Sequence, residues 1–161
     1  MKFIADGMLG KLTRWLRMLG QDVKYSNQSE DAELIVTAEK EHRILLTRDL
    51  ELYKRSSAKR VDAFYVEGQT EAEKLAGLAS RFGFSLTIDL NRSRCPKCNT
   101  KIQSTPKEKL AEKVENNTFA CYEKFWTCPK CGSVYWQGAH WKGIRKTLEE
   151  AKKIKSTKVN F

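Results

Sequence analysis

The sequence contains no long hydrophobic run. A membrane-spanning helix needs roughly 20 consecutive apolar residues, and the apolar stretches of this chain are much shorter. The start of the chain also lacks the charged segment, apolar run and cleavage site of a secretory leader. We therefore expect a soluble, intracellular protein of the cytoplasm with no membrane partner. Its 161 residues allow one ordinary domain, or one domain with a small appendage.

Acidic residues are too few to balance the basic ones. The chain has 30 Lys and Arg against 20 Asp and Glu, which gives a net charge of +10. Such a surplus favours a polyanionic partner, namely RNA, DNA or anionic lipid. Because no apolar segment accompanies the charge, lipid is the weakest of the three.

Cysteine is also scarce, and its spacing is informative. Four of the five cysteines form two CPKC motifs separated by 29 residues: Cys95, Cys98, Cys128 and Cys131. In a chain that is not exported, such pairs indicate metal binding rather than a disulfide framework. Four thiolates that leave no open coordination position are typical of structural zinc. Cys121 lies outside the pattern, and we expect it to be a half-buried thiol without a role.

Two short apolar strands each end in an aspartate. Asp6 follows the segment KFIA, and Asp49 follows the segment ILLTR. Ligands of parallel α/β sheets bind beyond the carboxyl ends of the strands, so both carboxylates are expected at one edge. Aspartate at a strand-to-helix junction is also a common helix cap, and that interpretation stays open for each. Thr47 and Arg48 are candidates for orienting a carboxylate or contacting a phosphate.

A third acid is predicted in the helix between these two strands. Ser29 resembles an N-cap for a helix that runs through about residue 40. Asp31 shares a helical face with Leu34, so its carboxylate is expected to point toward the sheet, where it needs a cation. Simple capping of the helix dipole is the alternative. Glu30 and Glu33 are the other candidates for this position.

The remaining pattern predicts the fold class. Strands are expected at residues 22–25, 61–66 and 85–90, and helices at 8–19, 50–57 and 70–83, the last with a Thr70–Glu73 capping box. Five strands alternating with helices predict a doubly wound or three-layer α/β domain with a mainly parallel sheet. On the first helix, Lys11, Arg14 and Arg17 form a polar face that either is solvated or contacts phosphate.

The second half of the chain has a different character. Residues 106–126 between the two CPKC motifs predict a short charged helix followed by a strand. Tyr135 and Trp136 are interpreted as core of a small zinc ribbon rather than as base-stacking residues, whereas His140 and Trp141 stay undecided. A helix is expected at 143–154, followed by a frayed basic tail.

Three stretches together resemble the Mut-seven C-terminal RNase family over nearly the whole chain. They are KFIADGMLGKLTRWLRMLG, ILLTRD, and RCPKCN with FWTCPKCGSVYWQGAHW. The resemblance implies a PIN-like three-layer nuclease domain at residues 1–91 and a four-cysteine zinc ribbon at 92–142, with a helix and basic tail at 143–161. It also implies RNA, single-stranded or structured, as the partner, and Mg²⁺ or Mn²⁺ held by Asp6, Asp31 and Asp49. A fourth acid of such nucleases has three imperfect candidates here: Asp62, Glu67 and Asp89.

The function expected from these patterns is metal-dependent endoribonuclease activity. Asp6 and Asp49 would hold the main ion, and Asp31 would position a second ion or the attacking water. Flanking phosphates would be bound by Lys11, Arg14 and Arg48, and the ribbon would aid RNA binding. Two rivals remain: a non-catalytic RNA-binding or ribosome-associated module, and a DNA-directed or toxin-like nuclease.

Overall fold

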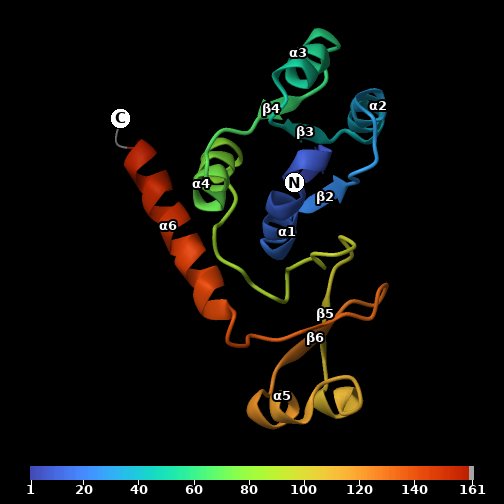
Figure 1. The fold of residues 1–161 in the computed structure, drawn as a ribbon, viewed down its shortest axis with the longest axis vertical. Coiled ribbons are helices and arrows are strands. Elements are labelled where there is room, and N and C mark those ends of the chain that lie inside the picture. The colour runs from blue at the N-terminus through green and yellow to red at the C-terminus, as the bar shows by residue number, and fades with distance from the viewer. Residues whose placement is uncertain (160–161) are drawn as a thin grey trace.

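The computed structural model describes residues 1–159, which form an α/β unit, a small β unit and a long C-terminal helix (Figure 1). The α/β unit is built on a four-stranded parallel sheet in the order β2-β1-β3-β4. Its strands are β1 (Lys2–Ala5), β2 (Asp22–Tyr25), β3 (Ile44–Thr47) and β4 (Ala63–Tyr65). The predicted α/β class with a parallel sheet and a small cysteine-bearing ribbon is confirmed.

Helices cover both faces of this sheet. One face is covered by α1 (Gly10–Met18), which the short helix η1 (Gly7–Leu9) precedes, and by α4 (Glu71–Phe82); the other is covered by α2 (Asp31–Glu41) and α3 (Leu50–Ala58). Successive strand residues point to opposite faces. Phe3 and Ala5 of β1 accordingly pack in the first core, and Ile4 packs in the second. The result is the predicted three-layer arrangement.

Helix capping explains where two of these helices begin. The Thr70 hydroxyl accepts from the Glu73 N–H at 3.1 Å, and the Glu73 carboxylate accepts from the Thr70 N–H at 3.0 Å, which confirms the predicted capping box. The N-cap of α2 is Glu30 rather than the predicted Ser29. The Glu33 carboxylate accepts from the Glu30 N–H at 3.3 Å, so this acid supports the helix end.

The predicted strand at residues 85–90 is wrong. This segment is extended but pairs with no other described strand. Its alternating apolar residues serve two cores: Leu86 is buried under the parallel sheet, Leu90 is buried in the β unit, and Ile88 contacts both. The alternation of apolar residues along this segment therefore reflects a linker that packs on both units, not the pairing of a strand in a sheet.

The β unit is a three-stranded antiparallel sheet in the order β5-β6-β7. Its elements are β5 (Gln103–Thr105), η2 (Lys107–Leu110), α5 (Asn116–Cys121), β6 (Phe125–Thr127) and β7 (Val134–Tyr135). The helix and strand predicted between the CPKC motifs are present. Trp126 and Trp141 are buried beside the cysteines, and Tyr135 and Trp136 pack against apolar clusters, as the core interpretation predicted. His140 is exposed.

The chain then returns to the α/β unit through α6 (Trp141–Val159), which runs along α4 (Figure 1). Leu148 and Ala151 of α6 are buried in the core beneath the parallel sheet. The helix begins two residues before the predicted position 143 and continues past the predicted end at 154, and residues 160–161 of the expected tail lie outside the described part. No described helix combines the length and apolar character needed to cross a membrane.

Arg17 and Asn99 fasten the two units together. The Arg17 guanidinium is 5 % exposed and donates to the carbonyl oxygens of Val23, at 2.7 and 3.0 Å, and Pro96, at 2.9 Å. Asn99 accepts from the Val23 N–H at 3.0 Å and donates to Asp22 at 2.7 Å. Neither expected environment of Arg17, solvent or phosphate, is correct, because the first CPKC motif covers this end of α1.

An ion-pair network lies next to this junction. Arg43 is 8 % exposed and pairs with Asp22 at 2.8 Å and with Glu41 at 2.7 Å, while Lys24 pairs with Glu41 from outside. Hydrogen bonds from Lys24 and then Arg43 lower the pKa of Glu41 to about 2. Glu41 therefore holds its charge in the folded chain at a pH where it would be protonated in the unfolded chain.

This shift predicts an acid-dependent loss of stability. The folded-state pKa of Glu41 lies below the unfolded value of about 4.3. The contribution of Glu41 to the free energy of unfolding is thus fully present above about pH 5 and disappears as the pH falls toward 2. We expect Glu41→Gln to flatten the dependence of the unfolding free energy on pH between 5 and 2, measured by urea denaturation. An unchanged slope in the variant would contradict this assignment.

Candidate functional site

Asp6 is the most buried acid at the carboxyl edge of the sheet. It follows β1 directly, and its backbone N–H donates to Leu46 of the neighbouring β3 at 3.1 Å. One carboxylate oxygen accepts from the Met8 N–H at 2.8 Å, so Asp6 caps η1, and the other accepts from the Thr47 hydroxyl. The residue is 5 % exposed, yet within the described residues no Lys or Arg lies within 4.0 Å of its carboxylate. Buried carboxylates are usually paired with a cation or coordinate a metal.

Thr47 connects Asp6 to the end of the next strand. Its hydroxyl is fully buried, donates to Asp6 and accepts from the Asp49 N–H at 2.9 Å. Asp49 is exposed, and its carboxylate accepts from the N–H groups of Glu51 and Leu52 at 2.8 and 3.1 Å. The capping role that the sequence left open is therefore present at both aspartates. Capping uses only part of each carboxylate, so one oxygen of Asp49 and the outer lone pairs of Asp6 can still bind another ligand.

Asp31 lies in the first turn of α2 and has a cationic partner. Its carboxylate is paired with Arg55 of α3 at 3.2 Å, and both side chains are about half exposed, 46 % and 49 %. The carboxylate is thus half exposed rather than turned into the core beside the sheet, and the cation that it was expected to need is supplied by the neighbouring helix. Within the part of the chain that is described, Asp6, Asp31 and Asp49 do not form a cluster with ligand atoms within 4.8 Å of one another.

The four cysteines of the CPKC motifs do form such a cluster. Their Sγ atoms all lie within 4.8 Å of one another, with Cys95 to Cys131 at 3.6 Å and Cys98 to Cys128 at 3.3 Å. Zinc–sulfur bonds of about 2.3 Å in a tetrahedron place the sulfurs roughly 3.8 Å apart. The arrangement is consistent with structural zinc. Cys121 lies outside it at the end of α5 and is exposed rather than half-buried as predicted.

The surroundings of the cluster lower the pKa of two of its cysteines, Cys98 and Cys131. Hydrogen bonding with the Ser133 hydroxyl lowers the pKa of Cys131 to about 6, whereas burial raises the pKa of Cys128 to about 11. The Tyr135 hydroxyl lies 3.0 Å from the Cys95 sulfur. Because thiolates rather than thiols bind metal, a cation at the centre would allow all four sulfurs to lose their protons together.

Residues 1–148 match the Mut7-C RNAse domain, so the match covers both the acidic edge and the cysteine cluster. The chain belongs to the Mut7-C RNase family. Membership of this family implies that the chain is a ribonuclease and that its substrate is RNA. No curated protein and no solved structure matches the sequence.

The predicted phosphate-binding cations of the Mut7-C domain have different environments. Lys11 and Arg14 are exposed on α1, which begins four residues after Asp6. Arg48 is part-buried, and its guanidinium donates to the carbonyl oxygens of Val66 and Gly68, at 3.2 and 2.5 Å. Arg48 therefore holds the loop that follows β4.

The fold also separates the three candidates for a fourth acid. Glu67 follows β4 and is exposed at the same edge as Asp6 and Asp49. Asp62 precedes β4 at the opposite edge, and Asp89 lies in the linker to the β unit.

The sequence did not predict the role of Arg55. Nothing in a helix expected at residues 50–57 indicates which acid of another helix its arginine will contact.

Proposed function

We propose that this chain is a metal-dependent endoribonuclease whose site is the carboxyl edge of the parallel sheet. Asp6 and Asp49 are the residues that would hold Mg²⁺ or Mn²⁺, Asp31 would act as the third acid, and Glu67 is the best-placed fourth. Oxygen ligands suit these hard ions, which keep several waters and accept a substrate phosphate as a further ligand. Lys11 and Arg14 would bind phosphates beside the cleaved bond, and Arg48, which also holds the loop after β4, would add its positive charge at this edge.

The observation that carries the proposal is the buried carboxylate of Asp6. Leaving an unpaired carboxylate away from water is costly unless a cation binds it. Thr47 fixes this carboxylate by donating to it and, by accepting from the Asp49 N–H, ties it to the start of α3. Two acids are thus held on rigid, hydrogen-bonded positions at the ends of adjacent strands, which fits one divalent ion.

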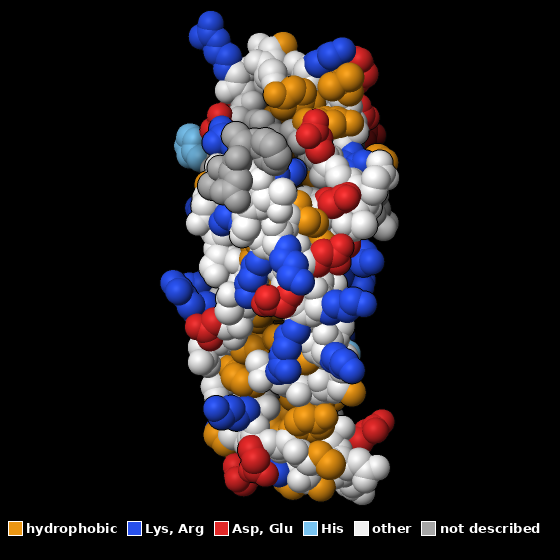
Figure 2. Space-filling model, turned by 90° about the vertical axis from the view of Figure 1, so that its left-hand side faces the viewer, with side chains coloured by type: hydrophobic (Ala, Val, Ile, Leu, Met, Phe, Trp, Pro, Cys, Tyr) orange, Lys and Arg blue, Asp and Glu red, His pale blue; other side chains and the backbone are white. Residues whose placement is uncertain are grey.

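The chemistry divides between the ion and the protein. A bound divalent ion polarises the phosphoryl oxygens and lowers the pKa of water. The protein holds the two acids, and Asp31 orients the attacking water or a further ion. Exposed cations on α1 neutralise flanking phosphates. Lys and Arg side chains also gather over the middle of the face that carries α6, with acids between them (Figure 2), which supports a long anionic substrate.

The direct test is a cleavage assay on a labelled single-stranded RNA. We expect fragments with added Mn²⁺ or Mg²⁺ and none without, and no cleavage of DNA of the same sequence. Circularised RNA separates endonuclease from exonuclease action, because only an endonuclease cuts a circle. Cleavage of DNA alone, or cleavage independent of added metal, would contradict the proposal.

One observation favours a second candidate, a non-catalytic RNA-binding module. All three acids already have partners: Asp6 and Asp49 cap helices, and Asp31 pairs with Arg55. A chain of this kind would bind RNA equally well with or without Mg²⁺ and yield no products on long incubation. The same RNA substrate separates the two candidates when binding and cleavage are measured side by side.

Arg55 provides a test of the third acid. Exposed ion pairs contribute less than about 1 kcal/mol, so an ion or a water could take over the Asp31 carboxylate. If Asp31 acts in the site, Arg55→Ala frees it, and we expect half-maximal cleavage at a several-fold lower Mn²⁺ concentration. Lys54→Ala, one residue away and equally charged, is the control. An identical Mn²⁺ dependence in Arg55→Ala and wild type would remove Asp31 from the site.

A further inference from the structure

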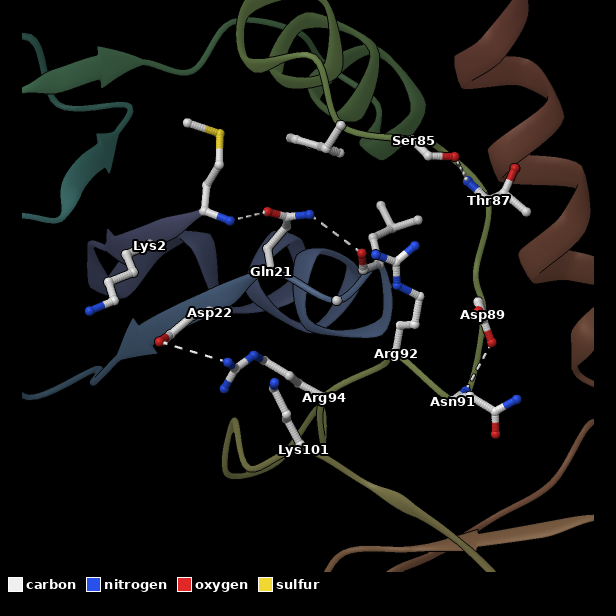
Figure 3. A pocket seen from close by; sticks show the side chains of 14 residues that line it. Lys2, Gln21, Asp22, Ser85, Thr87, Asp89, Asn91, Arg92, Arg94 and Lys101 are labelled. Carbon is white, nitrogen blue, oxygen red and sulfur yellow. Dashed lines mark hydrogen bonds and ion pairs between the residues drawn. The ribbon is translucent and has the colours of Figure 1, made fainter.

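A cavity of about 800 Å³ lies where the α/β unit meets the β unit (Figure 3). Its wall is formed by the starts of β1 and β2, the end of α1, and the linker from α4 into the first CPKC motif. This is the edge of the sheet opposite to Asp6. Along β1 the two are separated by four residues, or roughly 13 Å, so the cavity is not part of the acidic site.

The charged groups that line the cavity are mainly basic. Four cations, Lys2, Arg92, Arg94 and Lys101, face two carboxylates, Asp22 and Asp89. Asp22 is already bound by Arg43 and Asn99, and Asp89 accepts from the Asn91 N–H at 3.0 Å. No ion pair or hydrogen bond of the Lys2, Arg92 or Lys101 side chain is found within the described residues. The cavity therefore carries a positive charge that its own acids do not neutralise.

Arg94 and Lys101 concentrate two of these positive charges on one side of the cavity. They are antiparallel bridge partners, which places their side chains on one face of the ladder. Figure 3 shows both beneath Asp22. Like charges directly opposite each other destabilise a strand pair. Arg94 donates to the Asn99 carbonyl oxygen at 2.9 Å and lies 4.0 Å from Asp22, which Arg43 shares, whereas Lys101 is exposed and forms no ion pair within the described residues.

We infer that this cavity is an anion site that binds phosphate groups of the RNA chain at a distance from the cleavage edge. That the bound polymer is RNA rests on the proposed function, whereas the positive charge of the site does not depend on it. A volume of about 800 Å³ is within the range of small-ligand pockets, so it holds a nucleotide unit. Arg92 and Lys101 are exposed and have no partner among the described residues, so both can bind phosphate, and Arg92 offers the guanidinium fork that suits it. Arg94, which donates to the Asn99 carbonyl oxygen, adds its positive charge to the wall. A free nucleotide presents the same phosphate chemistry.

The test compares two charge-matched double variants. Arg92→Ala with Lys101→Ala removes two cavity cations. Lys40→Ala with Lys59→Ala removes two exposed cations at the C-terminal ends of α2 and α3, neither of which lines the cavity. Binding of a fluorescent 20-nucleotide single-stranded RNA is measured by anisotropy over a salt series without added Mg²⁺ or Mn²⁺. Because no cleavage is needed, failure of this inference is distinguishable from failure of the nuclease proposal. Circular dichroism and melting temperature verify folding.

The expected result is a roughly tenfold weaker Kd for the cavity variant at low salt. Its slope of log K against log salt falls by about 1.4, which corresponds to two lost phosphate contacts on a single strand, while the control changes less than twofold. Equal weakening of both variants would reduce the effect to net charge and overturn the inference. The inference would also be overturned if the cavity variant kept its RNA affinity but no longer bound a mononucleotide. That result would assign the site to a free nucleotide.

Discussion

Asp6→Asn is expected to abolish metal-dependent RNA cleavage while leaving the fold intact. The change removes the negative charge from the one buried acid without a cationic partner at the sheet edge. If the ion contributes several kcal/mol of transition-state stabilisation, the rate falls by about 10³-fold or more. Gel analysis of the labelled RNA under saturating Mn²⁺ measures the effect.

The folding control for this variant follows from its hydrogen bonds. The Asn amide oxygen can still accept from the Met8 N–H, and its NH₂ group can donate to the Thr47 hydroxyl. We therefore expect a melting temperature within a few degrees of wild type. Glu39→Gln, an exposed acid of α2, is the matched control and keeps full activity. Substantial cleavage by a folded Asp6→Asn protein would refute the assignment.

Cys131→Ala is expected to release the metal of the ribbon and unfold the β unit. Binding of zinc by four thiolates contributes on the order of 10 to 16 kcal/mol in small zinc domains, and the β unit has only small apolar clusters to replace it. We expect zinc content to fall from about one ion per chain to near zero. Fluorescence of the buried Trp126 and Trp141 is expected to shift to longer wavelength as water reaches them.

Cys121→Ala is the control for the metal-binding cysteines. Cys121 is exposed and lies outside the four-sulfur cluster, so its loss leaves zinc content and tryptophan fluorescence unchanged. Zinc retained at full occupancy by Cys131→Ala would contradict the four-thiolate site. Because Arg17 and Asn99 join the first CPKC motif to α1 and β2, loss of zinc is also expected to lower the melting temperature of the α/β unit.

Local patterns in the sequence identified most of the fold. The Thr70–Glu73 capping box, the apolar strands that end in aspartate and the paired cysteines each depend on neighbours within a few residues, and each is present in the structure. Residues 85–90 were wrongly predicted to form a strand, because alternating apolar residues are equally compatible with a strand and with a linker that is buried on one side. Burial alone does not specify hydrogen-bond pairing.

The candidate site was harder to predict because its environment comes from distant segments. Arg17 lies on the polar face of α1 in sequence, but Pro96, 79 residues away, covers it. Asp31 was expected to need a cation, and the sequence did not indicate that Arg55 of another helix supplies it. In both cases the partner of a charged side chain is set by tertiary packing, which local periodicity does not record.

The central claim is that a divalent ion binds at Asp6, and Mn²⁺ titration followed by electron paramagnetic resonance tests it most directly. The zinc-loaded wild type is compared with Asp6→Asn and Glu39→Gln, with free Mn²⁺ read from its six-line signal. We predict a saturable Mn²⁺ site in wild type and Glu39→Gln that is at least about tenfold weaker in Asp6→Asn. Equal Mn²⁺ binding by all three proteins, or none by wild type, would contradict the account.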